Sequence, residues 1–363
     1  MADSDIALTL TGGMDSRLIL AALLRAGLKP KCLTFGNHAA IDVLLSKHIA
    51  SDFNLEHYTP ASITPTSEWY YKWVTETIKI DAGNSHLHRA HRTAAIAEYV
   101  KRNPVKLLFT GHMGGEGLRG LSYNNYFASN FYEGVMEHRG SIEELFRDTL
   151  MRYFVQDIHI DYSKYREIIN NLSWIKQDSK EVNKLFFIYN LLGNTHHAQD
   201  IRLYNHYVPK VVPVYLQREY LETLFSSEYN FISKDRAILS RLNNPKVYCK
   251  VIEYLYPKLL DYPLANRFTP REYMKGLYYY VPVKIYRSYI RKVSYPPTFT
   301  YGEWYLDFVR EHSANISDYI WQFYDKDKYM RALREDIHQQ SEGYWHKFSN
   351  PIYFDLVDKI TNV

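Results

Sequence analysis

The sequence has very little cysteine: Cys32 and Cys249 are the two cysteines among 363 residues. Two cysteines exclude a disulfide-stapled scaffold and a zinc site built from cysteine thiolates. Low cysteine usage suits a reducing compartment, because thiols are kept reduced there. We therefore expect a cytoplasmic protein.

Long apolar runs and strong net charge are missing as well. No apolar run is long enough to cross a membrane, and the N-terminus lacks the charged-then-apolar pattern of a secretory signal. The formal net charge of +4 is small for this length and is not typical of nucleic-acid-binding proteins. We expect neither a membrane nor a nucleic acid as a partner.

The chain does contain enough apolar material for a globular core. Hydrophobic residues make up 46% of the sequence and charged residues 23%, and 363 residues suffice for one large or two moderate domains. Tyrosine is unusually common, with 34 residues. We expect most of these tyrosines to pack half-buried, with the hydroxyl near water.

A glycine turn follows the first predicted strand. The apolar residues 6–10 predict a strand, residues 11–16 read Thr-Gly-Gly-Met-Asp-Ser, and apolar residues at helical spacing after them predict a helix. A strand, a glycine turn and a helix N-terminus together form an anion site. The glycines let the backbone approach a phosphate, and free amides and the helix dipole attract it.

Each residue of this turn has an expected role. The backbone of Gly12 and Gly13 would cradle phosphate. Thr11 and Ser16 can add hydroxyl donors. Asp15 can hold a magnesium ion, because Mg²⁺ prefers oxygen ligands.

Strands and helices alternate through the first third of the chain. We expect strands over 6–10, 31–35, 55–58 and 105–109, with helices between them. This alternation predicts an α/β fold, a parallel twisted sheet with helices on both faces. Ligands of such sheets bind beyond the carboxyl ends of the strands. The glycines expected at that edge are Gly12, Gly36 and Gly111.

Residues 11–16 resemble the Ser-Gly-Gly-x-Asp-Ser loop of the N-type ATP pyrophosphatases. The stretch Cys-Leu-Thr-Phe-Gly at 32–36, with Asp42 and Leu55 after it, resembles the second strand and following helix of the asparagine synthetase synthetase domain. The resemblance implies an adenine nucleotide alpha hydrolase-like fold that cleaves ATP between its α and β phosphates. It also implies that Leu33 and Phe35, together with Thr34, flank the adenine.

Residues 110–120 resemble the second glycine loop of that family, and two alignments are open. Without a gap, Gly115 replaces the family's magnesium-binding aspartate. With one residue inserted at Met113, Glu116 takes that place, and we favour this alignment because the chemistry needs a carboxylate. His112 stands where asparagine-forming members carry a glutamate tied to amide formation, which puts asparagine synthesis itself in doubt.

Later matches to the family are looser. Residues 246–263 resemble a segment in which a lysine neutralises charge on the phosphates, with Lys250 the first candidate and Lys246 the second. Residues 211–216 match an apolar, proline-containing segment, but Val211 and Gln217 replace its arginine and aspartate.

The resemblance implies a domain organisation. We expect a nucleotide-binding core at 1–125, a helical region completing the synthetase domain at 126–295 and a helical tail at 296–363. Helices are expected over 141–154, 182–192 and 218–225, and residues 194–200 are a polar stretch. Glutamine-dependent members carry an N-terminal amidotransferase domain, and we expect that domain to be missing here or supplied by a separate chain.

The function implied is ATP- and Mg²⁺-dependent amide formation. A carboxylate is activated as an acyl-adenylate with release of pyrophosphate, and ammonia or another amine then displaces AMP. A nucleotide-binding scaffold without activity and a different adenylating enzyme of the same ATP class are the alternatives.

Several polar residues have a structural interpretation beside a functional one. His57 fits a strand-end histidine better than a ligand, and Arg17 could touch phosphate or face solvent from the first helical turn. Helix capping explains the tract of His86, His88, Arg89, His91 and Arg92 better than metal binding does, and the pair His196 and His197 is usually structural.

Overall fold

In a computed structural model of the chain, the residues that can be described are 5–36, 38–59, 66–81, 87, 90–115, 144, 196–227, 245–290, 302–335 and 342–361. The chain forms two compact units, each assembled from separate stretches of sequence. Unit 1 consists of Met1–Ile63, Ala94–Leu121 and Asp200–Tyr301, and unit 2 of Thr64–Thr93, Ser122–Gln199 and Gly302–Val363. The sequence-based boundaries at 125 and 295 stay a prediction.

Unit 1 contains a five-stranded sheet whose strands all run parallel, in the order β3-β2-β1-β4-β5. Leu8 of the central strand pairs with Cys32 on one side and Phe109 on the other. The parallel sheet expected from the alternating pattern is confirmed. The strands are β1 (Ile6–Thr9), β2 (Lys31–Leu33), β3 (His57–Tyr58), β4 (Leu107–Thr110) and β5 (Lys210–Pro213).

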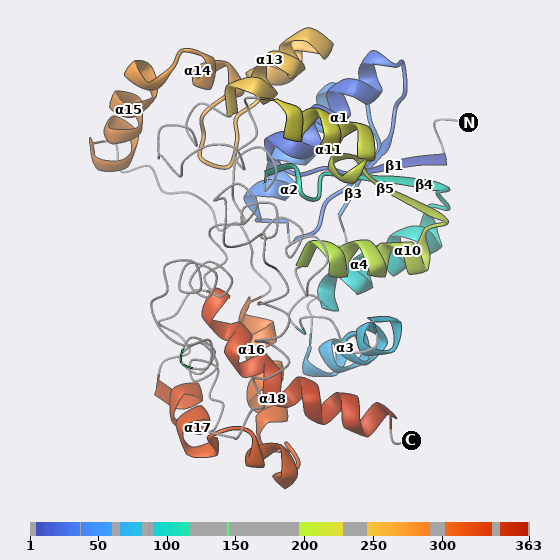
Figure 1. Ribbon diagram of the computed structural model, residues 1–363, viewed down its shortest axis with the longest axis vertical. Coiled ribbons are helices and arrows are strands. Elements are labelled where there is room, and N and C mark those ends of the chain that lie inside the picture. Colours follow the sequence, from blue (N-terminus) through green and yellow to red (C-terminus); the bar gives the residue numbers. More distant parts are fainter. Residues whose placement is uncertain are drawn as a thin grey trace. The chain divides into compact units, whose positions relative to one another are not determined.

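Helices cover this sheet (Figure 1). Residues of α1, α11 and α13 share one apolar core with Leu8 and Leu10, whereas α4 and α10 lie on the other side of the strands in Figure 1. The helices are α1 (Met14–Arg25), α2 (Ile41–Asp52), α4 (Ala90–Arg102), α10 (His196–Tyr207), α11 (Arg218–Ser226) and α13 (Pro245–Leu255), with a 3₁₀ turn, η6 (Val214–Leu216), after β5.

Residues 194–200, which the sequence shows only as a polar stretch, lie partly in a helix, because α10 begins at His196. The stretch lacks an apolar stripe, so hydrophobic periodicity does not mark it as a helix. Gln199 and Asp200 are nevertheless fully buried. The inward face of this helix therefore begins with polar side chains.

Unit 1 ends in short helical segments. A capping box, in which the Thr269 side chain accepts from the Glu272 amide and Glu272 accepts from the Thr269 amide, starts α14. The segments are η8 (Pro257–Asp261), α14 (Pro270–Met274), α15 (Leu277–Ile285) and a π-helical turn, η9 (Tyr286–Ile290).

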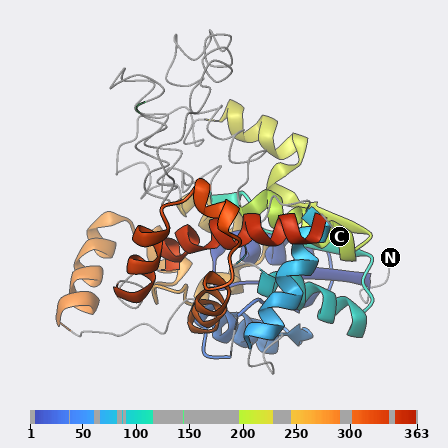
Figure 2. The same cartoon turned by 90° about the horizontal axis from the view of Figure 1, so that it is seen from below.

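Unit 2 is helical where it is described (Figure 2). Its core joins apolar faces of α3, α16 and α18, with Tyr70 packed on Tyr305 and Phe308. This confirms the amphipathic helices expected in the C-terminal tail. The elements are α3 (Ser67–Asp81), α16 (Gly302–Ser313), η10 (Asp318–Gln322), α17 (Lys326–Glu335) and α18 (Glu342–Thr361).

Two of the expected helices lie in parts of the chain that the structure does not describe. The helices over 141–154 (apart from Glu144) and 182–192 lie outside the residues that the structure describes. Among the helices of the described residues, none is both long and apolar enough to cross a membrane.

Cys32 and Cys249 are both buried and unpaired with each other, and burial raises the pKa of each thiol to about 12.

Tyr329→Phe tests the core of unit 2. The buried Tyr329 hydroxyl lies 2.7 Å from Ser313 Oγ and donates to the Phe348 carbonyl oxygen at 3.1 Å. Removing it leaves two buried polar groups short of a partner, so we expect a loss of about 1–2 kcal/mol in the free energy of unfolding, measured by urea denaturation. Tyr254→Phe, at a side chain that is 79% exposed, is the matched control and should leave the midpoint unchanged.

Candidate functional site

The strand order of the sheet reverses at the central strand, β1. The chain runs from β1 to β2 and β3 on one side, and then to β4 and β5 on the other. In open parallel sheets, ligands bind at such a reversal, outside the carboxyl ends of the strands. The turns after β1 and β4 both lie at this edge, as the sequence predicts. Below, residues 11–16 are called the first turn and residues 111–115 the second turn.

The two turns meet at the start of α1. A Cβ atom on Gly111 would lie 3.1 Å from the Ser16 amide nitrogen and 3.4 Å from Asp15 Cβ. One on Gly114 would lie 3.0 Å from Asp15 Cβ. Glycine is therefore what allows the second turn to approach the helix N-terminus so closely. Glu116, the predicted second metal ligand, lies outside the described residues.

The end of β4 carries a buried hydroxyl group. Thr110 is fully buried, and its Oγ1 has no hydrogen-bond partner within the described part of the chain. Buried hydroxyls without partners are uncommon in native proteins and call for an explanation. A polar ligand bound at the strand end would supply one.

The first turn is held by hydrogen bonds within the protein. The Thr11 amide donates to Ser16 Oγ at 3.0 Å, the Gly13 amide to Thr11 Oγ1 at 3.2 Å and the Gly12 amide to Asp42 Oδ1 at 3.0 Å. The groups expected to face phosphate are thus engaged with one another and with Asp42. An anion that used them would have to replace these bonds.

The first amides of α1, unlike those of the first turn, are not capped by a side chain. Gly13 is the N-cap residue, and no side chain caps the helix there. The N-terminal amides of a helix lack intrahelical acceptors and carry the positive end of its dipole. Asp15 lies in this first helical turn. An anion site at the α1 N-terminus is therefore compatible with a first turn whose own groups are already hydrogen-bonded within the protein.

Three tyrosines support the two turns. The Tyr215 hydroxyl donates to the Asp15 carbonyl oxygen at 2.7 Å, and the Tyr248 hydroxyl to the Gly114 carbonyl oxygen at 2.6 Å. Tyr220 packs edge-on against Tyr215, and its pKa is raised first by burial and second by the charge of Asp15. Neither Tyr215 nor Tyr248 was identified from the sequence, because their partners lie far away along the chain.

Arg17 does not face solvent, so that interpretation is wrong, and its terminal nitrogens donate to carbonyl groups of the chain. It is fully buried and donates to carbonyl oxygens of Gly12 at 3.1 Å, Tyr262 at 2.6 Å and Pro263 at 2.9 Å. A longer contact, 3.4 Å, reaches the Leu259 carbonyl oxygen. The guanidinium therefore ties the first turn to the segment after α13.

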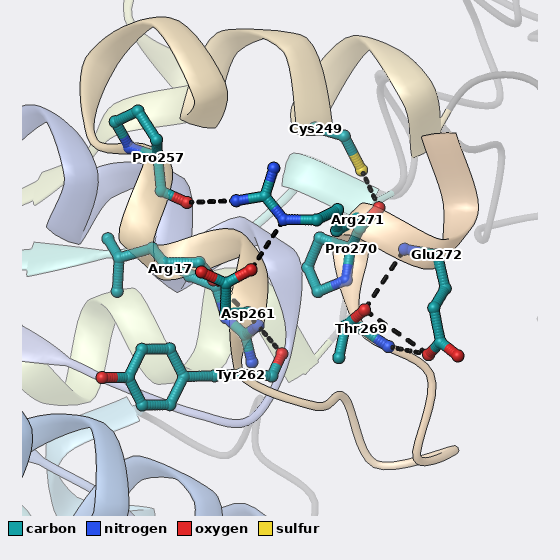
Figure 3. Close-up of polar contacts among 10 residues, drawn as sticks. Arg17, Cys249, Pro257, Asp261, Tyr262, Thr269, Pro270, Arg271 and Glu272 are labelled. Carbon is teal, nitrogen blue, oxygen red and sulfur yellow. Dashed lines mark hydrogen bonds and ion pairs between the residues drawn. The ribbon is translucent and has the colours of Figure 1, made fainter. Parts of the chain in front are cut away.

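Figure 3 shows Arg17 beside Tyr262 and the contacts that hold this segment in shape. Arg271 pairs with Asp261 at 2.6 Å, and Cys249 Sγ donates to the Pro270 carbonyl oxygen at 3.3 Å. Burial lowers the pKa of Arg17 to about 10, so the side chain stays charged at neutral pH.

His112, in the second turn, is paired with a buried carboxylate. Its Nε2 lies 3.1 Å from Asp200 Oδ2, and the two side chains are 10% and 0% exposed. The Tyr204 ring, one helical turn after Asp200, lies 5.8 Å from the His112 ring and stacks on Phe35 at 5.7 Å. The residues that α10 contributes here were missed because hydrophobic periodicity does not mark their polar stretch as a helix.

The residues expected to flank the adenine lie at the end of β2. Leu33 is fully buried, and Phe35 is half-buried against Tyr204. The structural interpretation of His57 is supported, because its Nε2 lies 2.9 Å from Thr34 Oγ1 and 3.1 Å from Ser46 Oγ. Burial, followed by the charge of Lys47, lowers the pKa of His57 to about 4.

The candidate lysines lie on α13. Lys250 is exposed, and Lys246 Nζ lies 3.8 Å from the position of a Cβ on Gly276. Within the described residues, neither lysine makes a hydrogen bond or ion pair with the two turns. A phosphate-binding role for Lys250 stays a prediction.

The described residues form no cluster of metal-ligating side chains. No group of three or more His, Cys, Asp or Glu residues in the described stretches could hold a metal ion. His91 is buried in α4, whereas His86, His88 and Arg89 lie outside the described residues, as do the side chains of His196 and His197.

Comparison with known proteins does not assign the chain to a family. No protein-family model matches the chain, and no curated protein matches it.

Arg17→Met tests the connection between the first turn and the segment after α13. The variant leaves buried carbonyl groups without their donor, so we expect at least about 3 kcal/mol of lost stability in urea denaturation. Arg17→Lys keeps the charge but loses the planar fork, so its stability should be intermediate. Arg25→Met, at an exposed arginine of the same helix, is the control and should change stability by less than about 0.5 kcal/mol. Equal midpoints for Arg17→Met and Arg25→Met would contradict the structural role of Arg17.

Proposed function

We propose that the chain binds ATP at the carboxyl ends of β1 and β4 and uses it to activate a small carboxylate for amide formation. The observation that carries the proposal is the convergence of two glycine turns on the N-terminus of α1, at the reversal of the strand order. The motifs of these turns supply the reaction class, through their resemblance to asparagine synthetase-like enzymes. The same resemblance favours an adenine nucleotide alpha hydrolase-like fold.

The residues at these strand ends fit a phosphate group. The α1 N-terminus has no side-chain cap, Gly111 lets the second turn lie close to that N-terminus, and the Thr110 hydroxyl has no partner within the described residues. Asp15 would hold a magnesium ion together with Glu116. That ion would neutralise charge on the phosphates.

Other side chains would hold the nucleotide and the turns in place. The backbone at Leu33 and the half-buried ring of Phe35 would face the adenine, with Tyr204 supporting the ring from behind. Arg17 would fix the position of the first turn through the Gly12 carbonyl group. Reactions of this kind depend mainly on positioning and charge neutralisation, so these contacts would contribute to the rate.

His112 would act in the second half-reaction. Asp200 binds Nε2 and so orients the imidazole ring, as a buried aspartate does in a catalytic triad. His112 would take a proton from the attacking amine at Nδ1. The amine would be ammonia, released by a separate amidotransferase, or another small amine.

A nucleotide-binding module without turnover is the second candidate. The observation that favours it is the closed state of the first turn, whose Gly12 and Gly13 amides are bonded to Asp42 and Thr11. A module of this kind would bind nucleotide through α1 and the second turn without accelerating exchange of pyrophosphate into ATP.

Asp15→Asn tests the proposed ATP site. We expect the parent chain to catalyse pyrophosphate exchange into ATP with one member of a carboxylate panel, and the variant to lose about 100-fold or more in exchange rate, because an amide is a poor ligand for the magnesium ion that offsets phosphate charge. Asp318→Asn is the control, since its carboxylate is fully exposed in unit 2. Nucleotide binding without exchange for any carboxylate would favour the second candidate, and equal exchange by both variants would contradict the proposed site.

His112→Gln and Asp200→Asn test the second half-reaction. We expect amide formation from ammonia to fall about 100-fold or more in each variant, with pyrophosphate exchange changed only a few-fold, because the amine is deprotonated after the adenylate has formed. Hydroxylamine is unprotonated at neutral pH and needs less help from a base. Its product, followed as the hydroxamate, should therefore fall much less. Equal losses with both amines would show that His112 has only a structural role.

A further inference from the structure

The outer face of α15 and the π-helical turn after it carries an exposed stripe of aromatic and aliphatic side chains. We call Tyr278, Val281, Ile285, Tyr286 and Tyr289 the α15 stripe. Tyr278 is 98% exposed, Tyr289 77%, and the other three are between 45% and 52% exposed. Their spacing places them along one side of the helix. In Figures 1 and 2, α15 lies beyond α14, away from the strands of unit 1.

The opposite face of α15 is held firmly to the rest of unit 1. Tyr280 stacks on Tyr273 at 5.0 Å and packs against Phe268 at 4.6 Å. Arg287 pairs with Glu272 at 3.0 Å and lies over the Phe268 ring. The helix therefore has a defined inner face, and the exposure of the α15 stripe follows from that packing.

The charged residues in the sequence segment that contains the α15 stripe have one sign. Between Glu272 and Glu303 the sequence contains neither aspartate nor glutamate. Of the basic residues in the helix, Lys284 is exposed beside the stripe, whereas Arg287 is used in the inner ion pair. The lysines and arginines between the two glutamates are Lys275, Lys284, Arg287, Arg291 and Lys292.

We propose that the α15 stripe docks on the surface of a membrane that contains anionic lipid. A helix with an aromatic and aliphatic face, an exposed lysine beside it and a basic sequence around it can lie in the membrane interface. Tyrosine suits that layer, because its ring is apolar and its hydroxyl reaches water. The absence of acidic residues from 273–302 favours an anionic surface over a neutral one. Such contact needs no spanning helix, and it revises the expectation that the protein has no membrane partner.

Co-sedimentation of the full chain with lipid vesicles tests the proposal. We expect the chain to sediment with phosphatidylcholine vesicles that contain phosphatidylserine, and about tenfold less with phosphatidylcholine alone or in high salt. The variant Tyr278→Ser, Ile285→Ser, Tyr289→Ser should lose about tenfold or more of its binding to the anionic vesicles, because it removes most of the apolar area that would enter the interface. Lys284→Glu should weaken binding to anionic vesicles and leave the small binding to neutral vesicles unchanged.

Tyr254→Ser is the matched control, because this tyrosine is 79% exposed on α13, away from the stripe. It should bind vesicles as the parent does, and circular dichroism should show that all variants are folded. The proposal is overturned if the parent does not sediment with vesicles or if the triple variant binds as well as the parent. It is also overturned if sedimentation velocity shows that the parent self-associates through the stripe and the triple variant does not.

Discussion

The geometry of the candidate site depends on one buried cation. Arg17 is removed from water, which is costly for a guanidinium unless its donors are satisfied. The two terminal nitrogens donate to the carbonyl group of Gly12 and to carbonyl groups 242 to 246 residues further along the chain, whereas Nε has no partner among the described residues. The first turn is therefore positioned by the segment after α13 as well as by its own strand and helix. Because the Tyr248 hydroxyl also reaches Gly114, α13 and the segment after it position both turns.

Local sequence patterns were sufficient to predict the central strands of unit 1 and the helix after the first turn. The strands at residues 6–10 and 105–109 and the helix after the first turn follow from apolar periodicity, and the glycines at Gly12 and Gly111 mark the strand ends. Periodicity could not reveal α10, because its inward face begins with Gln199 and Asp200. Nor could it assign Arg17, whose environment is made by carbonyl groups distant in sequence. A charged residue in a first helical turn is normally solvated, and only the tertiary contacts show otherwise.

The second turn contains a residue other than glycine with a positive φ. Met113 has a positive φ of 67° and is fully buried, although its side chain disfavours that backbone by about 1–2 kcal/mol. The neighbouring contacts fix the turn regardless: Gly114 lies against Tyr215, and His112 is paired with Asp200. Backbone of this kind persists only where the surroundings over-determine it, and it clusters at functional sites. An extra residue at Met113, the alignment favoured from the sequence, fits a turn that must take a left-handed step.

The closed first turn sets a condition on the proposed ATP site. The Gly12 amide donates to the carboxylate of Asp42, and a hydrogen bond to a charged group contributes about 1.5–3 kcal/mol. A phosphate that takes this amide must offset that loss and must also overcome repulsion from Asp42 and Asp15. The α1 dipole alone supplies about 0.3–1 kcal/mol at an exposed site, which is too little. On the proposed function, nucleotide binding therefore requires a divalent ion that screens these carboxylates, or a binding mode that leaves the Gly12 amide with Asp42 and uses the first amides of α1 instead.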